Sequence, residues 1–126
     1  MFILLDVLYM VKDFREFEVW KKGKLVVSHI YRITWWWHFD KDWWLRDQMR
    51  RASISVISNI AEWYNRNSKK EFSRFLRISK WSTAELIAQT EIAYMLEYIH
   101  EEDYTKIINE LNHLVNMFGK FISTLS

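Results

Sequence analysis

The lysine and arginine residues of this chain have the type and the spacing of a binding site for a negatively charged ligand. Half of its 18 Lys and Arg residues lie between Leu45 and Trp81, where only three carboxylates oppose them, so this stretch has a net charge of +6. The nine cations are Arg46, Arg50, Arg51, Arg66, Lys69, Lys70, Arg74, Arg77 and Lys80. Clustered guanidinium and ammonium groups neutralise phosphates. These nine are therefore our candidate nucleic-acid-binding residues.

The rest of the chain has the compensating charge. Residues 82–126 have a net charge of −5, although the whole chain of 126 residues has a net charge of only +2. Three interpretations fit this segregation: contact with RNA or DNA, head-to-tail packing of subunits, and a solvated helix face, which is the usual role of a run of charges. We favour nucleic acid, because simple solvation would not separate the two signs along the chain.

Catalytic and metal sites have little support in the sequence. The four histidines, His29, His38, His100 and His113, form no pair at a spacing of four residues. The absence of cysteine excludes thiolate ligands and cysteine nucleophiles. Two isolated glycines cannot form a phosphate-binding loop. We expect a protein that is not an enzyme and that holds no metal or cofactor.

The elements that must position the cations are helices. Two glycines and no proline in 126 residues leave little material for tight turns, which favours long helices joined by few loops. Apolar residues recur at spacings of three and four, as a buried helical stripe requires. The pattern predicts helices over about 14–34, 45–65, 69–99 and 101–125. The expected apolar stripe of the second helix is Leu45, Met49, Ala52, Val56, Ile60 and Trp63, and the expected core residues of the third helix include Ile92 and Leu96. Short connections between the later helices predict an all-α, antiparallel up-down four-helix bundle.

Several local expectations accompany this fold. Residues 1–12 form an apolar N-terminal extension without the features of a signal peptide, and residues 13–126 form the bundle domain. Ser68 and Glu71 form a capping box that starts the third helix. Two interpretations fit a polar stripe on the second helix that includes Arg51, Glu62 and Arg66. Its residues either pair with Glu85 and Gln89 of the third helix or join the phosphate-binding surface.

Five segments of the chain form a distinctive set: FREFEVWKK (Phe14–Lys22), Asp42 with Leu45–Gln48, RRASISVISNIAE (Arg50–Glu62), Ser68 with Glu71–Phe72 and Phe75–Leu76, and Ser82 with Glu85–Leu86 and Gln89. Together they resemble one known family, the small four-helix-bundle proteins encoded within intervening sequences of bacterial 23S ribosomal RNA genes. The resemblance implies an antiparallel bundle that assembles as a pentamer. The family is distantly similar to accessory proteins of diversity-generating retroelements, which bind nucleic acid and a reverse transcriptase.

The chain departs from this family at three positions. Trp44, Trp63 and Trp81 stand where the family usually has glycine. We expect each tryptophan to overpack a helix contact, at a cost of about 1–3 kcal/mol. We therefore hypothesise that the source reads UGA as glycine, with deliberate engineering as the alternative. A gene with UGG at these three codons would rule out recoding.

The sequence thus predicts a cytoplasmic homo-oligomer, with a pentamer favoured and no membrane association. Its expected ligand is structured RNA or DNA, bound by phosphate neutralisation. The alternative is a protein-interaction or assembly adaptor for a reverse transcriptase or another acidic partner, without a direct role on nucleic acid.

Overall fold

The computed structural model describes residues 13–35, 39, 41–64 and 69–125. These residues form a short 3-10 helix, η1 (Phe14–Glu16), and four long helices: α2 (Glu18–Ile33), α3 (Trp43–Tyr64), α4 (Lys69–Met95) and α5 (Glu101–Leu125). No strand occurs among them. The predicted all-α class with four long helices is therefore confirmed. No helix in the described ranges is long and apolar enough to cross a membrane.

The helix bounds differ from the predicted ones at two places. The first predicted helix is split at Phe17, whose extended backbone (φ −67°, ψ 134°) separates η1 from α2. The third ends at Met95 instead of continuing to Ile99. The predicted extension over 1–12 and the capping residue Ser68 lie outside the described residues.

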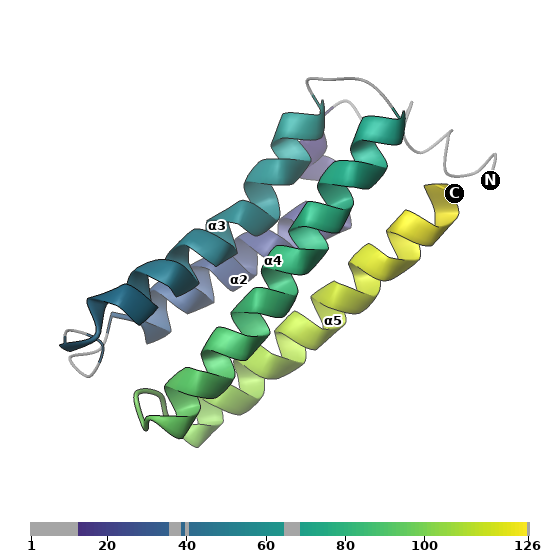
Figure 1. The fold of residues 1–126 in the computed structure, drawn as a ribbon. Coiled ribbons are helices and arrows are strands. Elements are labelled where there is room, and N and C mark those ends of the chain that lie inside the picture. The colour runs from purple at the N-terminus through teal and green to yellow at the C-terminus, as the bar shows by residue number, and fades with distance from the viewer. Residues whose placement is uncertain (1–12, 36–38, 40, 65–68, 126) are drawn as a thin grey trace.

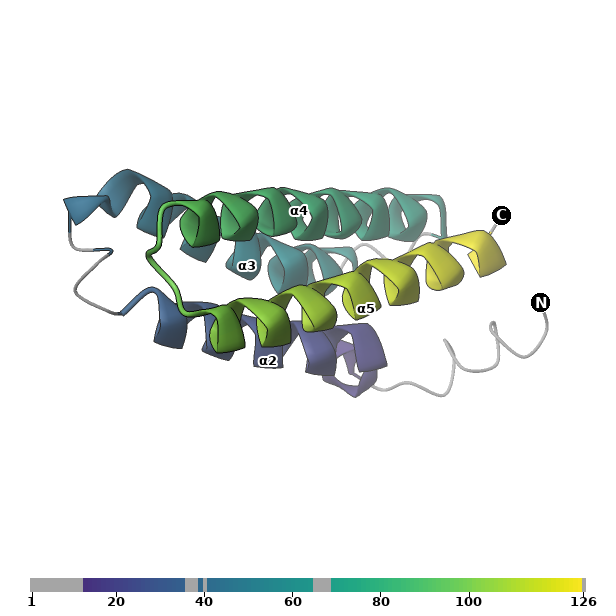
Figure 2. The same ribbon diagram turned by 90° about the horizontal axis from the view of Figure 1, so that it is seen from below.

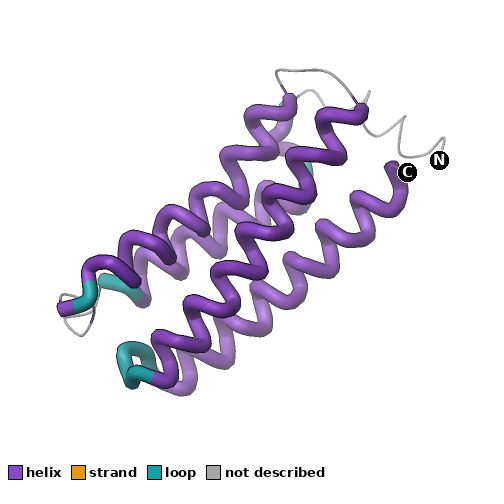
Figure 3. Tube along the Cα trace, viewed as in Figure 1, coloured by secondary structure: helices purple, strands orange, loops and turns teal. Residues whose placement is uncertain are grey.

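The four long helices lie side by side along their lengths (Figure 1). Seen from below, α3 and α4 form one layer, with α2 and α5 in a second (Figure 2). The described connections are short, and nearly all of the described chain is helical (Figure 3). Contacts of Phe17 and His29 join α5 to α2: the ring of Phe17, which caps α2, lies 5.7 Å from that of Phe121, and His29 Nδ1 lies 2.6 Å from Glu110 Oε2.

Apolar side chains from all four helices meet in one core. The predicted stripe of α3 is confirmed for its described members, all of them buried: Leu45, Met49, Ala52, Val56 and Ile60. On α4, however, the predicted core residues Ile92 and Leu96 are exposed. The buried side of α4 includes Thr83 and Thr90 instead, whose hydroxyls donate to the backbone carbonyls of Ser79 and Leu86 at 2.8 and 2.7 Å. These bonds satisfy the hydroxyls and make their burial possible.

The turn after α4 has the hydrogen bonds of a Schellman motif. The amide of Glu97 donates to the carbonyl of Tyr94, and that of Tyr98 donates to Ala93, both at 2.9 Å. Glu97 has φ 63°, in the left-handed region. Beyond the turn, the ring of Tyr104 stacks on Tyr94 with a centroid distance of 4.0 Å. The Tyr104 hydroxyl donates to Glu91 at 2.6 Å, and this bond raises the pKa of the phenol.

Gly23 sets the distance between α2 and α3. It is buried, and a Cβ atom added there would lie only 2.6 Å from Cγ2 of Ile57. The chain's other glycine, Gly119 in α5, is different, because its added Cβ would meet only Lys80 Nζ at 3.6 Å, an ordinary contact. Only the first glycine is therefore required by close packing.

We predict that Gly23→Ala and Gly119→Ala change stability in opposite directions. Alanine improves helix propensity by about 1 kcal/mol at either site. At position 23 it also overpacks the α2–α3 contact at a cost of about 1–3 kcal/mol, so the free energy of unfolding should fall by about 1 kcal/mol. At position 119 it should rise by up to about 1 kcal/mol. Urea unfolding measures both, and equal stability gains would show that α2 and α3 do not need the glycine.

We predict that Glu97→Gly stabilises the protein by about 0.5–1 kcal/mol. A side chain costs about 1–2 kcal/mol in the left-handed region, and the greater freedom of glycine in the unfolded chain offsets part of the gain. Glu97→Ala provides the control, because it removes the same carboxylate and keeps the Cβ atom. A thermal unfolding midpoint that rises for alanine as much as for glycine would assign the effect to charge instead.

Candidate nucleic-acid interface

The structure divides the predicted cations into two groups at opposite ends of the α3–α4 layer. The beginning of α3 lies beside the end of α4, where the Tyr98 hydroxyl donates to Asp42 Oδ2 at 3.0 Å; this bond raises the pKa of Tyr98. At mid-length, Ser79 Oγ donates to the carbonyl of Val56 at 2.8 Å. Arg51 and Arg74 are each five residues from this contact, in opposite directions, so they lie about 15 Å apart along the axis at about 1.5 Å per residue. The nine cations do not form one continuous patch.

The α3 group comprises Arg46, Arg50 and Arg51. Arg50 holds α3 against the end of α2: its Nε donates to Thr34 Oγ1 at 2.9 Å, and its guanidinium lies 4.5 Å from the centre of the Tyr31 ring. Arg46 is half-buried and stacks over Trp43 at 5.8 Å. Arg51 is exposed. Only Arg51 of this group presents a fully accessible cation.

The α4 group is more accessible. Lys70, Arg74 and Arg77 are exposed at one-turn intervals, and Lys80 is half-buried with its ammonium near Gly119 of α5. Arg74 NH1 lies 3.4 Å from Glu71 Oε2. Within the described part of the chain, no ion pair or hydrogen bond involves the side chains of Lys70 and Arg77. They are cations available for a ligand.

Two of the nine candidates cannot be assigned to either group. Arg66 lies outside the described residues, and the structure describes Lys69 only by its backbone, as the first residue of α4.

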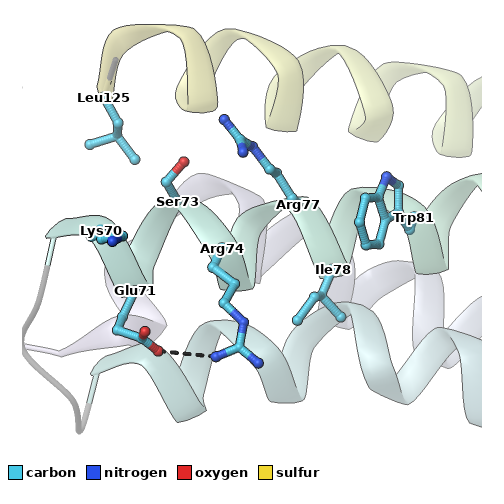
Figure 4. A pocket seen from close by; sticks show the side chains of 8 residues that line it. All are labelled: Lys70, Glu71, Ser73, Arg74, Arg77, Ile78, Trp81 and Leu125. Atoms are coloured by element: carbon cyan, nitrogen blue, oxygen red, sulfur yellow. Dashed lines mark hydrogen bonds and ion pairs between the residues drawn. The ribbon is translucent and has the colours of Figure 1, made fainter.

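Three of the α4 cations, Lys70, Arg74 and Arg77, line a groove with a volume of about 940 Å³. It is lined by Lys70, Glu71, Ser73, Arg74, Arg77, Ile78, Trp81 and Leu125. Figure 4 shows Ser73 and Arg77 reaching towards α5, with Leu125 of α5 facing them, while Glu71 and Arg74 form their ion pair on the other side of α4. The sequence pattern indicated the cations, but gave no sign that Leu125 and Ser73 complete their surroundings.

The seam between α3 and α4 is polar, and small side chains form its described hydrogen bonds. Ser55 Oγ and Ser82 Oγ lie 2.9 Å apart, and Asn59 Nδ2 donates to the carbonyl of Ser55 at 2.7 Å. Gln89 Nε2 donates to Glu85 within α4 at 3.2 Å. Arg51, the proposed partner from α3, is exposed. The hydroxyl groups of Ser55, Ser82 and Ser79 thus bridge the two helices. Pairing through Glu62 and Arg66 stays a prediction, because Arg66 lies outside the described residues.

Two of the unusual tryptophans do not overpack the bundle. Trp44 and Trp81 are 73% and 68% exposed, so the expected packing cost at these positions is wrong. Their packing therefore gives no argument for glycine in the native chain. The side chain of Trp63 lies outside the description.

The molecule is electrically polarised along its length. Lys70 and Arg77 lie at the end where α4 begins, beside the last turn of α5. The acids of the first turn of α5, Glu101, Glu102 and Asp103, lie at the other end, where the Tyr94–Tyr104 stack joins α5 to the last turn of α4. The groove is therefore remote from most of the chain's excess negative charge.

No cluster of potential metal ligands occurs in the described ranges.

Comparison with known families identifies the chain. A model of the 23S rRNA-intervening sequence protein family matches residues 15–120, from η1 through most of α5. The chain belongs to this family. No curated protein matches the chain.

The chain also resembles solved structures, one of which has a fold similar over most of its length. It is a protein of unknown function of the S23 ribosomal protein family from Bacteroides thetaiotaomicron VPI-5482. The two chains are 23% identical, the match covers 83% of this chain and 95% of that one, and the TM-score is 0.76. At this level of identity, the likeness supports the shared fold.

We predict that Arg50 contributes to stability and that Arg77 does not. Arg50→Ala removes a charge-assisted hydrogen bond and a cation–π contact to α2, and should lower the free energy of unfolding by about 1–2 kcal/mol. Arg77→Ala removes no described bond and should change it by less than about 0.5 kcal/mol. Chemical denaturation of both variants provides the measurement. A similar loss for both would mean that Arg77 is also a structural residue.

Proposed function

We propose that this family member is a non-enzymatic, self-associating protein that binds structured RNA or DNA through the basic part of α4. The observation that carries the proposal is the exposed pair Lys70 and Arg77 beside Arg74, whose side chains have no partner among the described residues and lie at the end of the molecule opposite the acidic first turn of α5. Three cations over two helical turns suit a run of phosphates, and no base-specific contact is required. Arg51 on α3 and the remaining candidate cations, Arg46, Arg50, Arg66, Lys69 and Lys80, have secondary roles.

The bundle that carries this surface is, in our proposal, antiparallel and up-down, with one domain over 13–126 acting in the cytoplasm. Contacts of Phe17 with Phe121, of His29 with Glu110 and of Ser79 with Val56 support this direction of the helices. We also propose a homo-oligomer, with a pentamer favoured. Exposed Trp44, Trp81 and Met95 support self-association, because large exposed apolar side chains often lie in subunit contacts.

We predict that the purified protein binds a structured RNA and a duplex DNA with an affinity that falls steeply between low and moderate salt. The triple variant K70A/R74A/R77A should bind more weakly and should reduce the slope of log affinity against log salt by about one for each lost phosphate contact. Fluorescence anisotropy with labelled RNA and DNA measures this, and light scattering records the mass alongside.

The matched control is K21A/K22A/K24A on α2, which removes the same charge from another face. It should retain most of the affinity. If both triple variants lose the same affinity, net charge alone explains the effect and the α4 surface is not the binding site. Absence of binding by the intact oligomer at low salt would refute the nucleic-acid proposal.

A second function is favoured by one specific observation. Three large apolar side chains are exposed near the end of α4: Ile92, Met95 and, just after the helix, Leu96. Such a surface suits a protein contact. The alternative is therefore an adaptor whose basic end meets an acidic partner, such as a reverse transcriptase, without a direct nucleic-acid role.

A further inference from the structure

The groove beside α4 has an apolar wall as well as cations. Ile78 and Trp81 of α4 and Leu125 of α5 line it together with Lys70 and Arg77. The indole of Trp81 is 68% exposed and rises at one end of the groove (Figure 4). A surface that only neutralises phosphates needs no such wall. The combination suits a ligand with a flat apolar part and a negative charge a few ångströms away.

The spacing of the groove residues fits one nucleotide. Arg77 and Trp81 are one helical turn apart, or about 6 Å along the axis of α4. A base stacked on the indole therefore places its own phosphate within reach of the guanidinium. The volume of about 940 Å³ also lies within the range of small-ligand sites, which is about 300–1,000 Å³.

We propose that this groove binds an unpaired nucleotide of a single-stranded nucleic acid, with the base stacked on Trp81, its phosphate held by Arg77, and a phosphate further along the strand held by Lys70. This inference rests on the function proposed above and defines its ligand more closely. In a duplex, the faces of the bases are covered by their neighbours, so the indole cannot reach them. Stacking on aromatic side chains tolerates every base and is typical of single-strand recognition. The preferred ligand is therefore a single strand, a loop or a bulge.

The groove side chains have separate tasks in this arrangement. Arg77, which reaches towards α5, and Lys70 hold charge on the side of Leu125. Arg74 is engaged by Glu71 at 3.4 Å and contributes less. Ile78 and Leu125 exclude water from the edge of the stacked base. The proposal thus assigns discrimination between single and double strands to Trp81, and general affinity to the cations.

The test compares a single-stranded RNA of 12 nucleotides with a duplex of the same length in anisotropy titrations. Trp81→Ala should weaken single-strand binding by about 5- to 150-fold, the effect of losing one stacked base, and should change duplex binding less than about twofold. Trp81→Phe should retain most of the single-strand affinity, and Trp81→Gly should behave like alanine. Trp35→Ala, which removes another exposed indole at the end of α2, should have no effect.

Other outcomes separate the two proposals. If Trp81→Ala leaves single-strand binding unchanged or weakens both ligands equally, the stacking site is wrong, but the basic surface stands. If the unaltered protein binds neither ligand at low salt, the proposed function itself fails. A free mononucleotide has the same base and phosphate as one unit of a strand, so a titration with UMP tests whether the strand is needed. UMP that binds as tightly as the strand would make the groove a mononucleotide site and overturn the single-strand proposal.

Discussion

The contact of three phenylalanines holds the basic end of the molecule together. Phe17, Phe72 and Phe121 come from the cap of α2, the first turn of α4 and the last turns of α5, and their ring centres lie 5.1–5.8 Å apart. Their tilted and edge-on geometry is the favourable one for aromatic pairs. The groove depends on this contact, because one of its walls comes from α4 and the other from Leu125 of α5. Without it, the cations of α4 would line an open helix face.

Much of the fold follows from the spacing of apolar residues, and the exceptions have a local cause. Hydropathy places Ile92 in the core and Thr90 outside it, whereas the structure has the reverse. A threonine whose hydroxyl donates to a carbonyl of the preceding turn is nearly as easy to bury as a valine, and a residue-by-residue pattern cannot register that bond. The close approach at Gly23 is hidden for a similar reason, because it depends on Ile57 of another helix.

The residues of the candidate site can be predicted only in part from the sequence. Residue type alone identifies the cations as possible phosphate ligands, and the three- and four-residue spacing in α4 predicts that its cations share one side of the helix. Their availability depends on neighbours: Arg50 is engaged by Thr34 and Tyr31, whereas Arg77 has no described partner. The way in which the helices pair also separates the α3 cations from the α4 cations. Leu125 enters the groove only because α5 returns to the beginning of α4.

The order of contacts along the chain also has a consequence for how the protein folds. α3 packs on α4 and α4 on α5, so most helix pairs join neighbours in the sequence, and such local topologies fold rapidly. The pair α2 and α5 is the exception, because Phe17 and Phe121 are separated by almost the whole bundle. Closing so long a loop costs the most chain entropy. We therefore expect α2 to dock onto α5 in the last step of folding. We expect the contact between these two helices to open first in local unfolding of the native state.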